Sequence, residues 1–449
     1  MENKHLYSEL QQYCREALAL LKREVGSSQR LPLVRRETVK CDDRGSWLPA
    51  YAPKVEWYRL VDNNTQNFKR MKSCQKAQQA MRQDSKIAVH LNNLVGTANS
   101  SMRIDEDECL RALLIQYLEE QQHWTFQKKA FNQVYRKIEK YFYKKTLEYR
   151  FFSLLGNFEM DAERIRLDSN LFIIKISKKE RQDLWLRARS LSGSAFSQLE
   201  VMSSKCALVF YLQVPKIIGS PQWIPPEKYP SNIVRKRFDE VCSALRLFKE
   251  GNISYNSIQM KATTWEPYGA INSFGPLSKQ YVLGSYRLLK DEIRTFRSFW
   301  RFYQRTSRSR SGSIGVAIRR FNFAYERTRQ EDKFIDYLIS LEALLFKKDE
   351  KQELSYKLAL RGSVLMGKNY NTKKEICDLL RAAYKERSNI VHGGTSKAVV
   401  TIAGHKIQFN DLVNRLEKYL RCSIRKFLAL LEKKSEKEII DSLDEKIIK

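Results

Sequence analysis

The sequence is poor in the residues and patterns from which many enzyme sites are built. It has five histidines, and its eight cysteines are scattered without a Cys-x-x-Cys pair or a histidine at metal-ligand spacing. This distribution argues against a zinc site and against a disulfide framework. Gly-x-Gly-x-x-Gly and the Walker pattern with Gly-Lys-Ser/Thr are absent, which argues against dinucleotide chemistry and ATP hydrolysis. We therefore expect no metal and no cofactor.

Long apolar runs and acidic side chains are scarce as well. No apolar stretch approaches the ~18 residues of a membrane-spanning helix, and no secretory leader pattern opens the chain, which predicts a cytoplasmic protein without a membrane partner. The 51 Asp and Glu residues face 81 Lys and Arg residues, so the formal net charge is +30. A charge of this size indicates a polyanionic partner, with RNA as the first candidate. The alternative is an interspersed basic surface on an ordinary protein.

Composition divides the chain into three regions and predicts a mostly α protein with a mixed α/β middle. Residues 1–152 form the N-terminal helical region, residues 153–306 the mixed α/β platform, and residues 307–449 a helical domain. Helical periodicity and β-branched or aromatic runs define the elements. The predicted helices are Leu6–Val25, Thr65–Leu94 and Asp105–Phe152, and the predicted strands are Leu171–Ile176, Ala207–Val214 and Ile253–Thr264.

The last of these helices interleaves lysine with tyrosine and phenylalanine. This pattern fits single-stranded RNA binding by phosphate contact and base stacking, and it also fits an ordinary helix with buried aromatics. We favour the ordinary helix. The segment Ser307–Ser313, Ser-Arg-Ser-Arg-Ser-Gly-Ser, is predicted to be a flexible basic linker. Around it lie five candidates for guiding RNA, for which a solvated linker and helix start is the alternative: Arg305, Arg308, Arg310, Arg319 and Arg320.

Beyond the linker, charged side chains fall on the apolar faces of three predicted helices. Glu342 flanks the stripe of the first helix, Arg361 lies on the line of the second, and Arg387 continues the apolar side of the third. A charge at a core-facing position is costly unless it is paired. We interpret Glu342 and Arg361 as a buried ion pair, which leaves Arg387 as the remaining cation.

A histidine follows Arg387 by five residues. His392 ends the stretch Arg-Ser-Asn-Ile-Val-His and is followed by two glycines, which predicts that the helix stops just after the imidazole. At ~100° per residue, His392 lies about 140° round the helix from Arg387, so one helix does not place both groups on one face. A two-fold dimer would bring two copies of the motif together across one groove. The alternative role for His392 is to stabilise the C-terminal end of the helix.

The C-terminal region resembles the Apea-like HEPN family, and the sequence just before it is similar to what precedes the domain in such proteins. The similarity covers the chain from about Leu154 onward, and the Arg-Ser-x-x-x-His-Gly ending is its most specific element. It is carried by Ala244–Lys249, Trp265–Pro267, Arg319–Arg327, Asp332–Leu345, Glu353–Met366 and Ala383–Gly394.

The resemblance implies a C-terminal HEPN-type helical bundle that dimerises and cleaves RNA, often tRNA, without a metal. It assigns catalysis to Arg387 and His392, with cleavage that leaves a 2′,3′-cyclic phosphate. Ser388 and Asn389 stand where an assisting residue follows the arginine in many family members. The implied biology is antiviral defence by a restrained, toxin-like nuclease, with a trigger or antitoxin protein as a further partner. The alternative is a noncatalytic RNA-binding or partner-binding scaffold within a ribonucleoprotein or toxin–antitoxin system.

Overall fold

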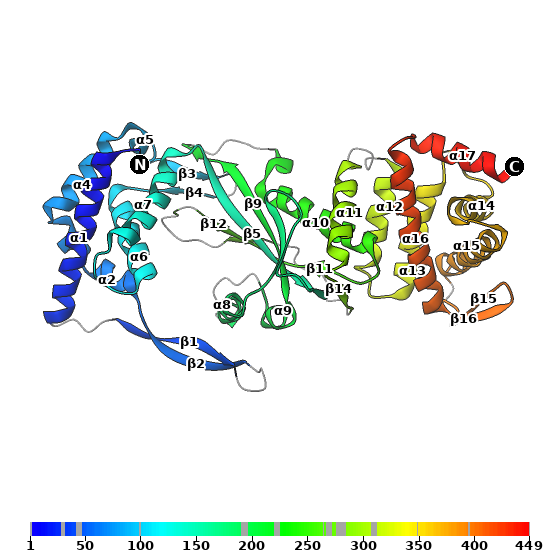
Figure 1. The fold of residues 1–449 in the computed structure, drawn as a ribbon, viewed down its shortest axis with the longest axis horizontal. Helices are drawn as coiled ribbons and strands as arrows, with labels where there is room; N and C mark the ends of the chain where they lie inside the picture. The colour runs from blue at the N-terminus through cyan, green and yellow to red at the C-terminus, as the bar shows by residue number, and fades with distance from the viewer. Residues whose placement is uncertain are drawn as a thin grey trace.

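The computed structural model is elongated, with the two ends of the chain at opposite ends of the long axis (Figure 1). It describes residues 2–27, 32–41, 47–97, 100–189, 196–219, 225–263, 265, 272–274, 284–306, 312–347, 349–393 and 396–448. Along the axis follow an N-terminal group of helices, a twisted sheet and a C-terminal helical bundle (Figure 1). The fold is therefore mostly α with a mixed α/β middle, as the sequence predicts. Within the described residues, no helix is both long and apolar enough to cross a membrane.

The N-terminal helices form because their apolar residues recur at three- and four-residue steps. In α1 (Lys4–Ser27), Leu10, Cys14, Leu18 and Leu21 are buried in this way. This confirms the predicted first helix. The second predicted helix is three shorter ones, and Asp84 separates the last two and caps the final one with its side chain. The elements of this region are α2 (Trp57–Asn63), α3 (Thr65–Lys69), α4 (Lys72–Gln83), α5 (Ser85–Ala88), α6 (Glu106–Gln121) and α7 (Lys128–Tyr143).

Four strands of this region were missed from the sequence. β1 (Leu33–Cys41) and β2 (Trp47–Val55) pair as a long antiparallel hairpin that extends away from the helices (Figure 1). β3 (Leu94–Thr97) and β4 (Ser100–Arg103) form a second hairpin, joined at one edge by β10 (Ile217–Ile218).

The helix predicted over Asp105–Phe152 is wrong at its C-terminal end. The stretch is α6, α7 and then β5 (Thr146–Gly156), so the region boundary predicted after residue 152 falls inside a strand. Leu147, Tyr149 and Phe151 are buried at alternate positions of β5, which is the two-residue period of a sheet. The lysine-rich and aromatic part of α7 buries Phe131, Tyr135, Tyr141 and Phe142 in the core, as expected for an ordinary helix.

The middle region is a seven-stranded antiparallel sheet with β5 and β9 (Cys206–Pro215) at its centre. The predicted strands at Leu171–Ile176 and Ala207–Val214 are confirmed, and the third predicted strand is two, β11 and β12. Strand order is β13 (Asn272–Phe274), β12 (Ile258–Ala262), β5, β9, β8 (Leu171–Lys175) and β7 (Arg164–Arg166), with β11 (Ser254–Tyr255) also on β5. β6 (Phe158–Met160) pairs in parallel with β14 (Tyr286–Leu288).

Helices cover both faces of the sheet. Phe151 contributes to the core that α10 (Pro230–Phe248) shares, whereas the adjacent Phe152 packs with α8 (Lys178–Arg189) and α9 (Gln198–Ser203) on the other face. A loop that contains Pro225 and Pro226 precedes α10. It includes a short 3-10 turn at Pro226–Lys228, α10 begins at Pro230, and Pro221 lies outside the described residues.

The C-terminal region is the predicted helical domain with one added hairpin. Helix α16 (Phe409–Leu431) runs through its middle and contacts α12 to α15 and α17. The predicted linker occupies the stretch between α11 and α12, and most of it lies outside the described residues. The other elements are α11 (Glu292–Arg305), α12 (Ser313–Ala324), α13 (Gln330–Leu345), α14 (Leu354–Met366), α15 (Tyr370–Val391), β15 (Val399–Ile402), β16 (His405–Gln408) and α17 (Glu436–Ile448).

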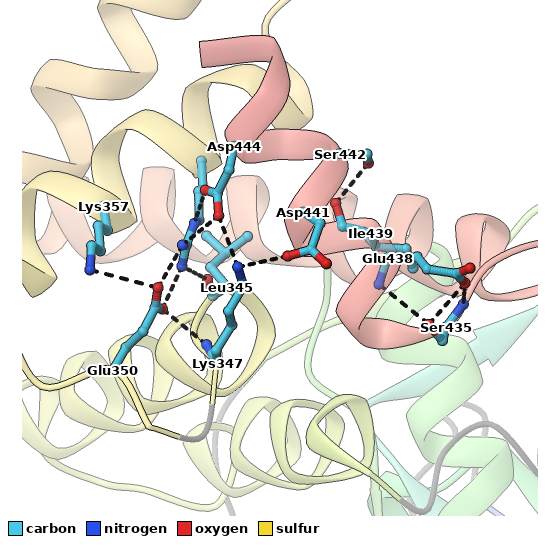
Figure 2. Close-up of polar contacts among 11 residues, drawn as sticks. Leu345, Lys347, Glu350, Lys357, Ser435, Glu438, Ile439, Asp441, Ser442 and Asp444 are labelled. Atoms are coloured by element: carbon cyan, nitrogen blue, oxygen red, sulfur yellow. Dashed lines mark hydrogen bonds and ion pairs between the residues drawn. The ribbon is translucent and has the colours of Figure 1, made fainter. Parts of the chain in front are cut away.

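Arg361 of α14 is buried, but the predicted pairing with Glu342 is wrong. Its guanidinium donates to Asp444 of α17 (2.6 and 2.9 Å), to Glu350 in the turn after α13 (2.6 and 2.6 Å) and to the Leu345 carbonyl (2.9 Å). All five N–H donors are thereby used. The physical reason is that Glu350 and Asp444 each offer two carboxylate oxygens within hydrogen-bond distance of the guanidinium. Figure 2 shows both carboxylates.

Lys347 adds a second cation to this cluster. Its ammonium lies 2.7 Å from an Asp441 oxygen and 3.2 Å from an Asp444 oxygen (Figure 2). Hydrogen bonds from Arg361 lower the pKa of Glu350 to about 2. Burial would raise the pKa of Asp444, but the hydrogen bonds and charge of Arg361 lower it instead. The cluster therefore fastens α17 to α14 and to the end of α13.

Replacing Arg361 by alanine removes the buried cation that Glu350 and Asp444 share and leaves them only the more distant Lys357 and Lys347 ammonium groups. We expect a loss of about 3–5 kcal/mol in the free energy of unfolding, measured by chemical denaturation at neutral pH. The matched Lys374→Ala change removes an exposed cation from α15 and should alter stability by less than about 0.5 kcal/mol.

The same substitution should change the pH dependence of stability. Because the pKa of Glu350 is depressed in the folded chain, its contribution is present above the ordinary value of 4.5 and is lost as pH falls toward 2. The Arg361→Ala variant should therefore lose less stability than the wild type between these pH values. Parallel curves for the two proteins would contradict this account of the cluster.

Candidate functional site

Helix α15 carries the Arg387 and His392 motif, and its two ends are both defined by local sequence. At the start, the Asn369 side chain accepts from the Thr372 backbone N–H (3.0 Å) while the Thr372 hydroxyl accepts from the Asn369 N–H (3.1 Å). At the end, His392 is the C-cap residue and Gly393 takes a φ of +86°. The prediction that the helix stops beside the imidazole is confirmed.

Arg387 is half-buried and pairs with Glu342 of α13. The Arg387 Nη2 to Glu342 Oε1 distance is 3.5 Å, which is long for a charge-assisted hydrogen bond. The guanidinium also lies over the ring of Tyr384 at 5.5 Å, and its buried Nε has no hydrogen-bond partner among the described residues. Arg387, for which the sequence predicted no partner, is therefore paired with Glu342, the carboxylate that was predicted to pair with Arg361.

Glu342 is a weak counter-charge for Arg387. Burial raises the pKa of Glu342, and the nearby Arg387 guanidinium opposes that rise without cancelling it. A carboxylate that is desolvated and contacts the guanidinium at only one nitrogen leaves most of the guanidinium N–H donors free for another acceptor. A phosphate oxygen is the acceptor that a guanidinium fork matches best.

His392 lies at the solvent-exposed end of the same helix. Its backbone N–H donates to the Ser388 carbonyl (3.1 Å), and within the described residues its ring makes no hydrogen bond. Ser388 is exposed, whereas Asn389 is partly buried and donates to Glu386 at 3.2 Å. The structure thus brings Arg387 to Glu342 and Asn389 to Glu386, and it leaves His392 and Ser388 open to solvent.

Glu386 was missed from the sequence, although it organises the end of the motif. Its side chain is 3% exposed, and its Oε1 accepts from the Lys397 backbone N–H at 2.8 Å while its Oε2 accepts from Asn389. Ser396 donates to Glu331 of α13 at 2.7 Å, which adds a second tether just after the motif. The signal was present, since Glu386 follows the buried Ala383 by three residues and so shares its helical face.

Of the five arginines predicted to guide RNA, three lie in the described residues. Arg320 pairs with the buried Asp336 at 3.0 Å, a carboxylate that it shares with Arg327. Arg305 lies 3.4 Å from Glu432 on the surface, and Arg319 is exposed. Arg308 and Arg310 lie outside the described residues. In the part of the chain that the structure describes, no group of three His, Cys, Asp or Glu side chains could hold a metal ion.

Removing the Glu386 carboxylate should loosen the segment that follows His392. Glu386→Ala leaves the Lys397 N–H without its buried acceptor, so we expect a loss of about 1–3 kcal/mol in the free energy of unfolding. Hydrogen exchange at the Lys397 amide should accelerate, and Glu386→Gln should restore part of the protection. The control is Glu375→Ala at an exposed position of the same helix. Unchanged exchange at Lys397 would contradict the tether.

Comparison of the chain with models of known protein families, with curated proteins and with solved structures finds no match. The similarity of residues 313–449 to Apea-like HEPN domains therefore stays a prediction from the sequence. The chemistry of α15 is inferred from its own side chains and their surroundings.

Proposed function

We propose that the protein is a metal-independent endoribonuclease of the HEPN type, with Arg387 and His392 as its catalytic residues. One observation carries the proposal. At the end of α15, an exposed imidazole follows a guanidinium that is paired only loosely, at 3.5 Å, with a desolvated carboxylate. The net charge of +30 suits an RNA substrate, because cations that neutralise phosphates release bound counterions.

The two side chains suit complementary steps of RNA cleavage. His392 takes the proton from the ribose 2′-hydroxyl or gives one to the departing 5′-oxygen, since an imidazole can act as a general base or as a general acid. Arg387 stabilises the negative charge that builds up on the phosphorane. The 2′-oxygen bonds to phosphorus as the 5′-oxygen leaves, which gives a 2′,3′-cyclic phosphate and a 5′-hydroxyl. Ser388 and Asn389 assist from the same helical turn.

A two-fold dimer completes the site. Arg387 and His392 lie about 140° apart round α15, so a second α15 is needed to place both kinds of group on one phosphate. Helix α15 supports such a partner, because only three of its 22 residues are buried, namely Leu380, Ala383 and Glu386. Tyr370 and Val391 on this helix are 76% and 56% exposed.

The biological role that goes with this activity is antiviral defence in the cytoplasm, with host RNA such as tRNA as the target. A nuclease of this kind must be restrained until infection. The sheet of the middle region and the N-terminal helices are the parts of the chain that could receive a trigger or an antitoxin protein.

A noncatalytic RNA-binding or partner-binding scaffold, within a ribonucleoprotein or toxin–antitoxin system, is the second candidate. It is favoured by the half-buried ion pair of Arg387 with Glu342, since a purely structural arginine would have such a partner. The two candidates differ in what they require of His392. A scaffold tolerates its loss, whereas the nuclease does not.

The test is cleavage of total RNA in the presence of EDTA by the wild type, Arg387→Ala and His392→Ala. We expect cleavage by the wild type and a loss of about 10²-fold or more in each variant, because proton transfer and charge stabilisation each contribute that much. Exposed residues elsewhere in the same domain give matched controls. Arg415→Ala on α16 and His405→Ala on β16 should cleave like the wild type.

The other outcomes separate the candidates. Equal cleavage by all five proteins would refute the assignment of Arg387 and His392. RNA that copurifies with the wild type but is never cut, with or without coexpressed phage proteins, would favour the scaffold.

A further inference from the structure

Helix α11 presents a row of four arginines along one face. Arg294, Arg297, Arg301 and Arg305 are all exposed and follow one another by three, four and four residues. At ~100° per residue these positions fall within an arc of roughly 80°. Neighbours at this spacing have Cβ atoms about 5–6 Å apart, so the row is a regular line of positive charge. We call these four residues the α11 row.

The outward direction of the row is fixed by the opposite face of the helix. Phe296, Phe299, Trp300 and Tyr303 are buried there. The ring of Phe296 packs edge-on against Phe248 of α10, with 5.3 Å between centroids. Because these aromatic side chains anchor α11, the helix cannot turn its arginines toward the protein.

The charges of the row are not balanced by nearby carboxylates. Among the described residues, Arg294, Arg297 and Arg301 have no ion-pair partner, and Arg305 has only the exposed contact with Glu432 at 3.4 Å. The single glutamate of the helix, Glu292, is held by Lys249 at 2.6 Å. Like charges at this spacing repel one another, so an unbalanced row suits a polyanionic partner.

A second helix places a cation next to α11, against its aromatic face. Arg425 of α16 is exposed, donates to the Phe248 carbonyl at 3.2 Å and lies over the ring of Phe299 at 5.1 Å. Both helices therefore carry exposed cations near the junction between the sheet and the bundle, where α11 lies (Figure 1). No large apolar side chain of α11 is exposed, which argues against insertion into a membrane surface.

We propose that the α11 row binds the phosphate backbone of RNA as a docking surface separate from the end of α15. The choice of RNA rests on the proposed function. In Figure 1, α11 lies on the side of the bundle next to the sheet, and α15 lies on the far side, beyond α12 and α16. An RNA that occupies both surfaces must span the bundle, so the row selects long or folded RNA over short oligonucleotides.

The test is RNA binding by the full chain with His392→Ala, which prevents cleavage during the measurement. Fluorescence anisotropy of a labelled single-stranded RNA long enough to span the bundle is recorded over a range of salt concentrations. Adding Arg294→Gln, Arg297→Gln and Arg301→Gln should weaken binding by about tenfold or more and lower the slope of log K against log salt by about 2. Each single substitution should give about a third of the change in slope.

The control removes the same charge elsewhere. Lys22→Gln, Arg23→Gln and Lys76→Gln neutralise three exposed cations of the N-terminal helices and should leave the salt slope unchanged. Equal slopes for the two triple variants would overturn the proposal, as would failure of the His392→Ala chain to bind any RNA. Because the readout is binding, this failure is distinct from failure of the nuclease, which is measured as uncut RNA.

Discussion

The buried guanidinium of Arg361 is the contact on which the C-terminal region depends. It joins three parts of the chain, since its acceptors lie at the end of α13, in the turn that follows and on α17. With Glu350 and Asp444 committed to Arg361, Glu342 is free to face α15. The Glu342 carboxylate then lies 3.5 Å from Arg387 Nη2. This distance is short enough to orient the guanidinium, but it is too long for a strong hydrogen bond. The position of the candidate catalytic arginine thus follows from a pairing elsewhere in the bundle.

The end of α15 combines a tethered part with an open part. Glu386 accepts hydrogen bonds from the Asn389 side chain within the motif and from the Lys397 backbone after it, which ties these parts of the chain together. His392 and Ser388 stay exposed between these tethers. An exposed imidazole on a fixed segment suits a group that must meet a substrate or a second chain. The α11 row adds a positive surface on the other side of the bundle, so an RNA substrate would have two points of contact.

Much of the fold could be predicted because its elements follow local periodicity. The apolar stripe of α1 and the β-branched run of β9 each determine one kind of element. Extending the α7 helix to Phe152 failed because an aromatic-rich stretch fits a helix or a strand until its partner strand is known. The β1 and β2 hairpin was missed because Pro49 and Pro53 argue against a strand, yet both pair with β1.

The residues of the candidate site could be predicted from the sequence, but the ion pairs that those residues form could not. Arg387 and His392 share one short motif, whereas Asp444 lies 83 residues from Arg361 in the chain, and no local pattern joins them. Glu386 shares the helical face of the buried Ala383, but the prediction considered only its neighbour Arg387 as the buried charge. The sequence shows the three- and four-residue spacing of the four arginines on α11. Only the burial of the aromatic side chains on the opposite face shows that the arginines point outward.

The central claim is that two copies of α15 share one site, and mixed dimers test it most directly. A dimer that pairs an Arg387→Ala chain with a His392→Ala chain, isolated through two different affinity tags, retains one arginine and one histidine from opposite chains. The account predicts that this mixed dimer cleaves RNA while both variant homodimers are silent. A mixed dimer as silent as the homodimers, under conditions in which the wild type cleaves, would contradict a site shared between chains.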